Sequence, residues 1–232
     1  MREQNYTKEG FLAGEVLLID KYIEWTSFDV VNKIRSSLKY KYDIPKIKVG
    51  HAGTLDPLAT GLLIICTGKK TKEIHNFQNL PKEYTAEIKL GETTPSFDTE
   101  TDVDAIFPTD HFTETDIINV IKSFKGKQLQ IPPDFSAKRV GGKRAYESAR
   151  KGKSLNLKPA EIEIYDIEIL KINIPFVEIK VNSSKGTYIR AVARDIGKKL
   201  NSGAHLTALR RTKIGKFSVD DAITVDFFQK KL

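Results

Sequence analysis

The pattern of hydrophobic and polar residues predicts several short strands. The apolar run Gly61–Thr67 is typical of a strand buried on both faces. A second pattern, over residues 161–172, alternates charged and apolar residues, but the alternation slips at Tyr165-Asp166, which predicts a bulge or a tight bend. The strand-like segments are 15–19, 61–67, 84–90, 161–172 and 176–181.

Helices are predicted between these strands. Ser27 opens the first, and Thr113 with Asp116 are start signals for the second. The apolar stripes of the three helices are Phe28, Val31, Ile34 and Leu38; Ile117, Ile121 and Phe124; and Ile189, Val192, Ile196 and Leu200. Residues 92–104 are rich in Thr and acids and predict an exposed loop. The alternation of predicted strands and helices indicates a mixed α/β (α+β) domain around an extended sheet.

Composition narrows the class of protein. The 232 residues are enough for one large domain or two small ones. Cys66 is the single cysteine and lies in an apolar run, so we expect a buried thiol, no intramolecular disulfide and a cytoplasmic location. Residues 1–10 are polar and predict a flexible tail, and no apolar run is long enough for a membrane helix.

The net charge is +8, from 38 Lys and Arg against 30 Asp and Glu. This excess favours a polyanionic partner, with nucleic acid as the first candidate, although a merely soluble basic protein has the same composition.

The segment from His51 to Gly61, which reads HAGTLDPLATG, is the strongest chemical signal. Its glycines allow tight turns or the close approach of a bulky ligand. Pro57 restricts Asp56 to an extended conformation, and the segment runs directly into the predicted buried strand, which would support it rigidly. An Asp-Pro pair also commonly opens a helix, with Asp as the cap, so the residues alone leave both interpretations open.

This segment resembles the catalytic motif of bacterial tRNA pseudouridine synthases of the TruB type, which their RNA-guided relatives share. Further motifs carry the resemblance over nearly everything from residue 14 to residue 224. They are Lys82-Glu83-Tyr84 with Leu90-Gly91; Gln130-Ile131-Pro132-Pro133; Ser136-Ala137-Lys138; Gly142-Lys143-Arg144-Ala145-Tyr146 with Arg150; Ser184-Lys185-Gly186-Thr187-Tyr188-Ile189-Arg190; and Gly203-Ala204-His205-Leu206 with Leu209-Arg210-Arg211.

The resemblance implies a pseudouridine synthase fold, with an extended, largely antiparallel sheet flanked by helices. Residues 11–232 would form one catalytic domain with a thumb-like, RNA-gripping insertion at about 132–153. The sequence departs from the family pattern in three respects. Tyr22 and Glu24 follow Lys21 where Pro and Gly are usual, Thr101 replaces a common Gly, and the chain leaves no room for the C-terminal RNA-binding (PUA) domain of many members.

For catalysis, the resemblance implies that Asp56 is the essential carboxylate, Arg190 its charged partner and Tyr84 the pocket tyrosine that stacks on the flipped base. The reaction breaks the bond from uracil N1 to the sugar and joins C5 to the sugar without oxidation, so no cofactor or metal is expected. Like a glycosidase carboxylate, Asp56 could be a nucleophile at the sugar or base, or a base that removes a sugar proton.

For RNA binding, the resemblance implies that Leu209 forms an apolar wall of the pocket and that His51 lies beside the displaced nucleotides. The thumb interleaves basic and aromatic side chains, which suits phosphates and bases. Its candidate RNA contacts are Lys138, Lys143, Arg144, Tyr146 and Arg150. Gly141-Gly142 would suit a hinge, and a role for Lys21 depends on its altered turn.

The function that this implies is conversion of the T-loop uridine of tRNA, position 55, to pseudouridine after base flipping. The expected partner is the T-arm stem-loop, with a monomeric enzyme and no obligate protein partner or membrane. The alternatives are a non-catalytic RNA-binding or RNA-folding module, a nucleosidase or glycosidase, and a synthase that modifies another uridine. The first would not need Asp56, and the second usually needs two carboxylates.

Overall fold

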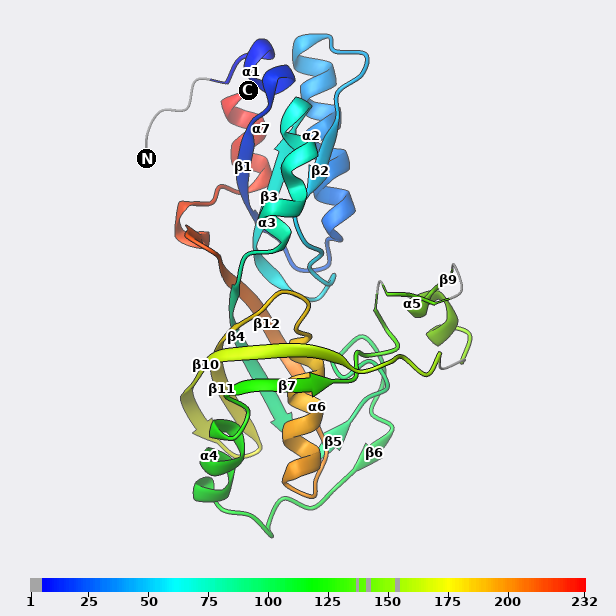
Figure 1. Ribbon diagram of the computed structural model, residues 1–232, viewed down its shortest axis with the longest axis vertical. Helices are drawn as coiled ribbons and strands as arrows, with labels where there is room; N and C mark the ends of the chain where they lie inside the picture. The colour runs from blue at the N-terminus through cyan, green and yellow to red at the C-terminus, as the bar shows by residue number, and fades with distance from the viewer. Residues whose placement is uncertain (1–5, 137, 141–142, 153–154) are drawn as a thin grey trace. The chain divides into compact units, whose positions relative to one another are not determined.

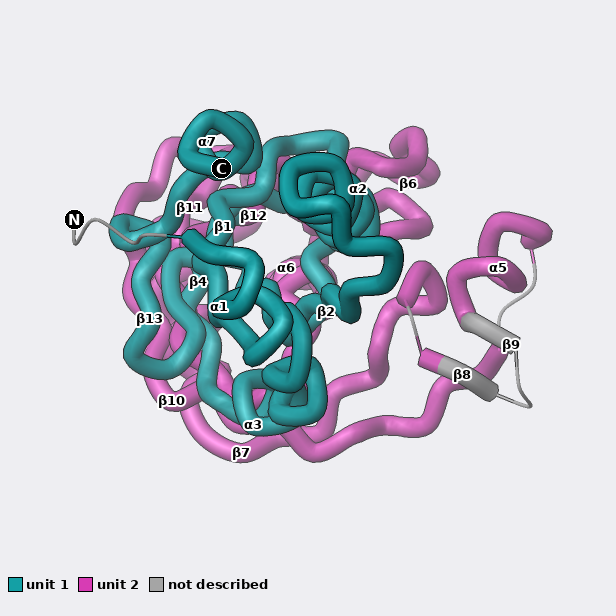
Figure 2. The backbone as a smooth tube through the Cα atoms, turned by 90° about the horizontal axis from the view of Figure 1, so that it is seen from above, with its two compact units in different colours: residues 1–84, 210–232 teal, residues 85–209 magenta. Residues whose placement is uncertain are grey.

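The computed structural model describes residues 6–136, 138–140, 143–152 and 155–232. The chain divides into two compact units, coloured separately in Figure 2: unit 1 is Met1–Tyr84 with Arg210–Leu232, and unit 2 is Thr85–Leu209. Strands β4 (Lys82–Leu90) and β12 (Ala204–Ile214) contribute residues to both units. Within the described ranges, no helix has the length and apolar character needed to cross a bilayer.

Unit 1 is a sheet with helices, and both ends of the chain lie in it (Figure 1). Its strand order is β1-β3-β12-β4, with β2 also paired to β3 and β13 to β12. Strand β1 is antiparallel to β3, whereas β12 is parallel to it. The elements that belong to this unit alone are α1 (Lys8–Ala13), β1 (Val16–Lys21), α2 (Ser27–Tyr42), β2 (Val49–His51), β3 (Thr60–Thr67), η1 (Gly68–Glu73), α3 (Ile74–Gln78), β13 (Phe217–Ser218), η2 (Val219–Asp221) and α7 (Val225–Lys231).

Helix α2 begins at Ser27, as predicted. Thr26 and Asp29 form a capping box, in which each side chain accepts a hydrogen bond from the other residue's backbone N–H. The apolar face of α2 packs into a core with residues of β1 and β3, which holds the start of the helix firmly. The predicted buried strand is β3, and Cys66 within it is fully buried; burial raises the pKa of its thiol to about 11, which makes it a poor nucleophile.

Unit 2 is built on a second part of the sheet, with the strand order β12-β4-β11-β10-β7. Helix α4 packs on β10 and α6 and begins with the predicted capping box of Thr113 and Asp116. The elements that belong to this unit alone are β5 (Glu92–Thr93), β6 (Ala105–Ile106), α4 (Glu114–Lys122), β7 (Gly126–Gln130), β8 (Arg139–Val140), β9 (Lys143–Arg144), α5 (Ala145–Ala149), β10 (Ala160–Asn173), β11 (Phe176–Ser183) and α6 (Ile189–Lys199).

The fold confirms the predicted mixed α/β class with a largely antiparallel sheet. The predicted slip in β10 is also confirmed, because its register against β11 shifts between Ile164 and Asp166. Two expectations differ from the structure. Helix α1 starts at Lys8, inside the expected tail, with the Thr7 side chain accepting a hydrogen bond from Gly10 N–H. The expectation of an exposed loop at 92–104 is wrong for Thr94, Ser96 and Asp98, whose side chains are buried.

Candidate active site

The segment that carries Asp56 is the loop that joins β2 to β3 in unit 1, and we call residues 52–59 the Asp loop. Asp56 is half-buried, and its carbonyl oxygen accepts a hydrogen bond of 3.1 Å from Ala59 N–H. A turn follows at residues 57–58 and β3 begins at Thr60, so no helix starts here. The alternative interpretation of Asp56 as a helix cap is therefore wrong.

Two buried cations lie on either side of the point where the Asp loop enters β3. Gly61 of β3 pairs with Lys21 of β1 on one side and with Arg211 of β12 on the other. Only about 1% of each of these two basic residues is exposed. Gly61 has a φ of +102°, and a Cβ there would lie 2.3 Å from the Arg211 carbonyl oxygen, so this position requires glycine.

Arg211 fixes the first half of the Asp loop. Its guanidinium donates to the carbonyl oxygens of Leu62, Gly53 and Thr54 at 2.7, 3.2 and 3.3 Å. Because these donors are charged and buried, the hydrogen bonds are stronger than those between neutral groups.

Lys21 and α2 hold the backbone next to Asp56, on its two sides. The ammonium donates to the carbonyl oxygens of Tyr22, Trp25 and Pro57 at 2.8, 2.6 and 3.1 Å. The Ser27 hydroxyl both donates to Leu55 C=O at 3.1 Å and accepts from Leu55 N–H at 2.8 Å. The backbone is thus held on both sides of Asp56, which restricts where its carboxylate can point.

Burial and charge also act on the ionisable groups around the loop. Burial lowers the pKa of Lys21 from 10.5 to about 8, against the attraction of the Asp56 carboxylate, which raises it. His51, half-buried at the end of β2, has a lowered pKa because of burial and the nearby charge of Arg211. His51 is therefore a neutral imidazole at pH 7, suited to hydrogen bonding and not to charge pairing with RNA phosphates.

Tyr84 and Leu209 lie at the unit boundaries. Tyr84 is on β4, the last residue of the first segment of unit 1, and is buried with 9% exposed. Leu209 is on β12, the last residue of unit 2, and is half-buried. Their roles in a base pocket stay predictions.

Arg190, near the start of α6 in unit 2, is 3% exposed. Its Nε lies 3.4 Å from Asp98 Oδ2, and its other nitrogens donate to the carbonyl oxygens of Ser96 and Phe135 at 3.0 and 2.8 Å. Arg190 is therefore bound to the segment that the sequence had predicted to be exposed. Its pairing with Asp56, a residue of the other unit, stays a prediction.

The start of α6 is itself held by a buried side chain. Gln130, at the end of β7, donates from Nε2 to Tyr188 C=O at 3.1 Å and accepts from Tyr188 N–H at 2.9 Å. Tyr188 caps α6, so the amide of Gln130 fixes the turn of backbone that carries Arg190. The Gln-Ile-Pro-Pro motif thus has a structural role next to the thumb.

The predicted thumb contains β8, β9 and the short helix α5. The Arg150 guanidinium lies 5.2 Å from the centre of the Tyr146 ring and pairs with Glu100 at 2.8 Å. Lys138 is half-buried, and its carbonyl accepts from Ala145 N–H at 2.8 Å. The side chains of Lys143 and Arg144 and the expected hinge at Gly141-Gly142 lie outside the described residues. The structure thus brings two candidate RNA contacts together and pairs one of them with an acid.

Comparison with known proteins identifies the family. Residues 37–189 match the model of the N-terminal domain of TruB family pseudouridylate synthases, and residues 190–232 match that of the C-terminal domain of tRNA pseudouridylate synthase B. The chain belongs to the TruB family. It is 57% identical over 210 residues to tRNA pseudouridine synthase B of Parabacteroides distasonis, across 90% of this chain and 89% of that one. It is 51% identical to the Flavobacterium johnsoniae protein of the same name, across 97% and 99%.

Solved structures show the same fold. A Cbf5–Nop10–Gar1 complex matches with a TM-score of 0.71 and 30% identity, over 96% of this chain and 57% of that one. An H/ACA RNP bound to a substrate RNA containing 2'-deoxyuridine matches with a TM-score of 0.67 and 29% identity, over 94% and 54%. The TruB-family chain therefore spans little more than half the length of these two neighbours.

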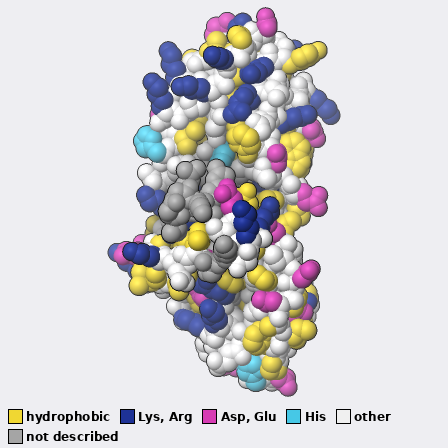
Figure 3. Space-filling view, turned by 90° about the vertical axis from the view of Figure 1, so that its right-hand side faces the viewer, with side chains coloured by type: hydrophobic (Ala, Val, Ile, Leu, Met, Phe, Trp, Pro, Cys, Tyr) yellow, Lys and Arg dark blue, Asp and Glu magenta, His cyan; other side chains and the backbone are white. Residues whose placement is uncertain are grey.

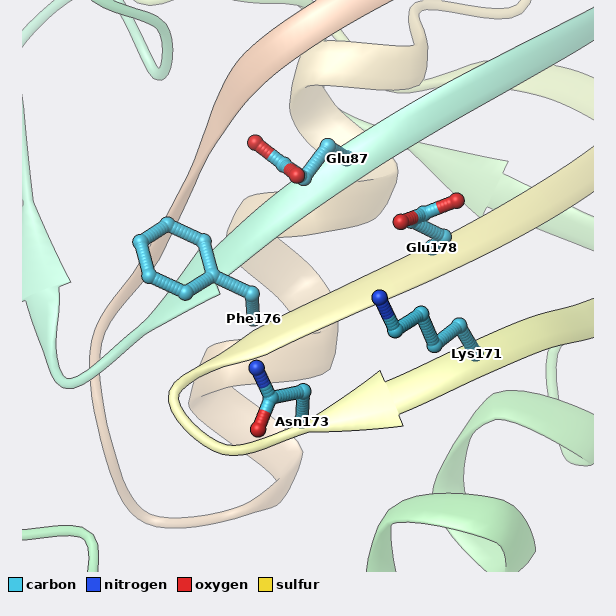
Figure 4. Close-up of a pocket in the computed structure, with 5 residues that line it drawn as sticks. All are labelled: Glu87, Lys171, Asn173, Phe176 and Glu178. Atoms are coloured by element: carbon cyan, nitrogen blue, oxygen red, sulfur yellow. The ribbon is translucent and has the colours of Figure 1, made fainter.

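A small pocket elsewhere in unit 2 lies between strands β4, β10 and β11 (Figure 4). Its volume of about 100 Å³ is well below the roughly 300–1,000 Å³ usual for ligand sites. The side chains that line it are Glu87, Lys171, Asn173, Phe176 and Glu178. None of them belongs to the sequence motifs that carry the resemblance to the TruB family. We assign no function to this pocket.

Sequence reasoning gave no role to several residues that organise the site. Ser27, Asp98 and Arg211 each hold a candidate catalytic segment through contacts distant in the sequence. Arg211 lay within a matched motif, and the acids of the 92–104 segment were a visible signal for an arginine partner. Nothing local marked Ser27 as more than a helix start.

Proposed function

We propose that this chain converts the T-loop uridine of tRNA, position 55, to pseudouridine, with Asp56 as the essential carboxylate. The observation that carries the proposal is the fixed Asp loop, whose backbone is bound by the buried Lys21 and Arg211. Family membership supports the reaction, and the names of the relatives, tRNA pseudouridine synthase B, support tRNA as the substrate.

The chemistry needs a carboxylate with a defined position more than it needs several reacting groups. The bond between uracil N1 and C1′ of the sugar breaks, the base turns, and C5 bonds to C1′ while the C5 proton leaves. Whether Asp56 attacks the sugar, attacks the base or removes a sugar proton, it acts as an ionised group at one point of the substrate. A backbone that is held before the substrate binds lowers the entropic cost of reaching that geometry.

The remaining candidate residues serve substrate binding. Because a base in a folded RNA must leave its stack before it reacts, the enzyme needs an aromatic surface to receive it. Tyr84 supplies this surface, with Leu209 as the apolar wall. Arg150 and Tyr146, which already contact each other, suit the grip of a phosphate and a neighbouring base.

The test is to incubate the protein with unmodified tRNA and to map pseudouridine along the RNA. We expect modification at position 55 by the wild type, none by Asp56→Asn, and equal tRNA affinity for both, because this substitution keeps the shape and removes the charge. Asp221→Asn, an exposed aspartate of the same unit, is the matched control and should be fully active. Modification at another position, or an active Asp56→Asn, would contradict the proposal.

A further inference from the structure

The positive charge of the chain is not divided evenly between the two units. Unit 1 holds 19 of the 38 Lys and Arg residues but 13 of the 30 Asp and Glu residues, a net +6. Unit 2, which contains the thumb, holds the other 19 basic and 17 acidic residues, a net +2. Most of the excess charge therefore lies outside the unit that carries the expected RNA grip.

Within unit 1 the excess comes from two segments, residues 33–48 and 68–75. Their basic residues are Lys33, Arg35, Lys39, Lys41, Lys46, Lys48, Lys69, Lys70 and Lys72. Their acids are Asp43 and Glu73, and the latter pairs with Lys70 at 2.9 Å. Figure 3 shows Lys and Arg side chains gathered over the part of the view that holds α2 and its neighbours.

The two segments lie side by side. Gly68 N–H, at the start of the second segment, donates to Lys48 C=O, at the end of the first, at 2.9 Å, and the next residues, Val49 and Thr67, are paired in β2 and β3. We define the lysine face as the exposed Lys46, Lys48 and Lys69, which this backbone contact brings together. In the part of the chain that the structure describes, none of the three forms an ion pair, so their ammonium groups face solvent.

The lysine face is displaced from the Asp loop. Lys48 precedes β2, and the three residues of β2, which end with His51, carry the chain about 10 Å before the Asp loop begins. Helix α2 spans about 24 Å from Ser27, which is bonded to the Asp loop, to its end at Tyr42. A substrate whose uridine reacts at Asp56 would therefore meet the lysine face with a different part of its backbone.

We propose that the lysine face binds the phosphate backbone of tRNA outside the T-arm, as a second RNA-binding surface in addition to the thumb. This inference rests on the proposed function. Lysine ammonium groups on flexible stems act as point charges for phosphate and make no base-specific contacts, so the surface adds affinity without adding sequence recognition. It also gives a function to the net positive charge of unit 1, which lies outside the unit that carries the thumb.

The experiment compares two charge-matched triple variants on two substrates. One variant replaces Lys46, Lys48 and Lys69 by Ala; the control replaces the exposed Lys216, Lys230 and Lys231 of the same unit. The substrates are full-length unmodified tRNA and the isolated T-arm hairpin. KM, kcat and the salt dependence of Kd are measured for each pair, and circular dichroism verifies folding.

For the lysine-face variant we expect KM for full-length tRNA to rise about tenfold with kcat unchanged. The slope of log affinity against log salt should fall by roughly 2 to 3, because each phosphate contact contributes somewhat under one. The hairpin should be unaffected, and the control variant should behave as wild type on both RNAs.

An equal loss on both RNAs would overturn the proposal, because the face would then grip the T-arm itself. No loss on either RNA would also overturn it, as would an equal loss in the control variant, which would reflect net charge alone. Failure of the proposed function has a different signature, since wild type would then form no pseudouridine at position 55 in either RNA. The Kd comparison would still test the lysine face in that case.

Discussion

Replacement of Lys21 by Met removes a buried ammonium group. Burial lowers the pKa of this group from 10.5 to about 8. The folded protein releases this proton near pH 8, whereas the unfolded chain keeps it until about pH 10.5. Between these values the unfolded state binds more protons, so the free energy of unfolding rises with pH. At about 1.36 kcal/mol per pKa unit, the wild type should gain roughly 2.5 kcal/mol between pH 7 and pH 10 relative to Lys21→Met.

The assay is urea unfolding of both proteins at pH 7, 8, 9 and 10. Trp25 is the single tryptophan and its carbonyl accepts from Lys21, so its fluorescence reports on this part of unit 1. Lys33→Met, at an exposed position of α2, is the control and should keep the wild-type pH dependence. A stability difference between wild type and Lys21→Met that is constant with pH would refute the reasoning. It would mean that the three carbonyl acceptors stabilise the ammonium as well as water does.

Three further predictions concern the site. Tyr84→Phe should bind tRNA normally and slow a later step, whereas Tyr84→Leu should also lose about 1–3 kcal/mol of stacking on the base. If the kinetics of both variants equal those of the wild type, the role of Tyr84 is structural only. Asp98→Asn should lower kcat roughly 10- to 100-fold, or about 1.4–2.7 kcal/mol, because the buried Arg190 guanidinium loses the carboxylate that lies 3.4 Å from its Nε; unchanged kcat would show that Asp98 is dispensable. Glu100→Gln should release Arg150, tighten tRNA binding and steepen its salt slope by somewhat under about one, whereas weaker binding would show that the pair orders the thumb.

Local signals predicted the elements well. The start of α2 and the start of α4 each depend on a capping box within four residues of sequence, and both are present in the structure. The slip at Tyr165-Asp166 likewise appears as a register shift of β10 against β11. Such features depend on neighbouring residues, so a single sequence contains what is needed to predict them.

The arrangement around Arg190 could not be predicted in this way. A Thr- and acid-rich segment is usually solvated, but Thr94 and Ser96 donate to the carbonyl of Asp98 within the segment, and Asp98 meets Arg190 about ninety residues further along the chain. Burial of these polar groups is tolerated because each has a partner, and the decisive partner is distant in sequence. The same holds for Arg211, which reaches the Asp loop across more than 150 residues.

The altered turn after Lys21 shows how strongly the Asp loop constrains its surroundings. Glu24 has a φ of +67°, in the left-handed region where the family usually places glycine, at a cost of about 1–2 kcal/mol for a residue with a side chain. Its N–H donates to Pro57 C=O at 2.8 Å, the same carbonyl that the Lys21 ammonium binds. Because both donors must meet this carbonyl next to Asp56, the backbone of the turn keeps the left-handed conformation although the glycine is absent. The left-handed turn at Glu24 thus helps to hold the Pro57 carbonyl beside Asp56.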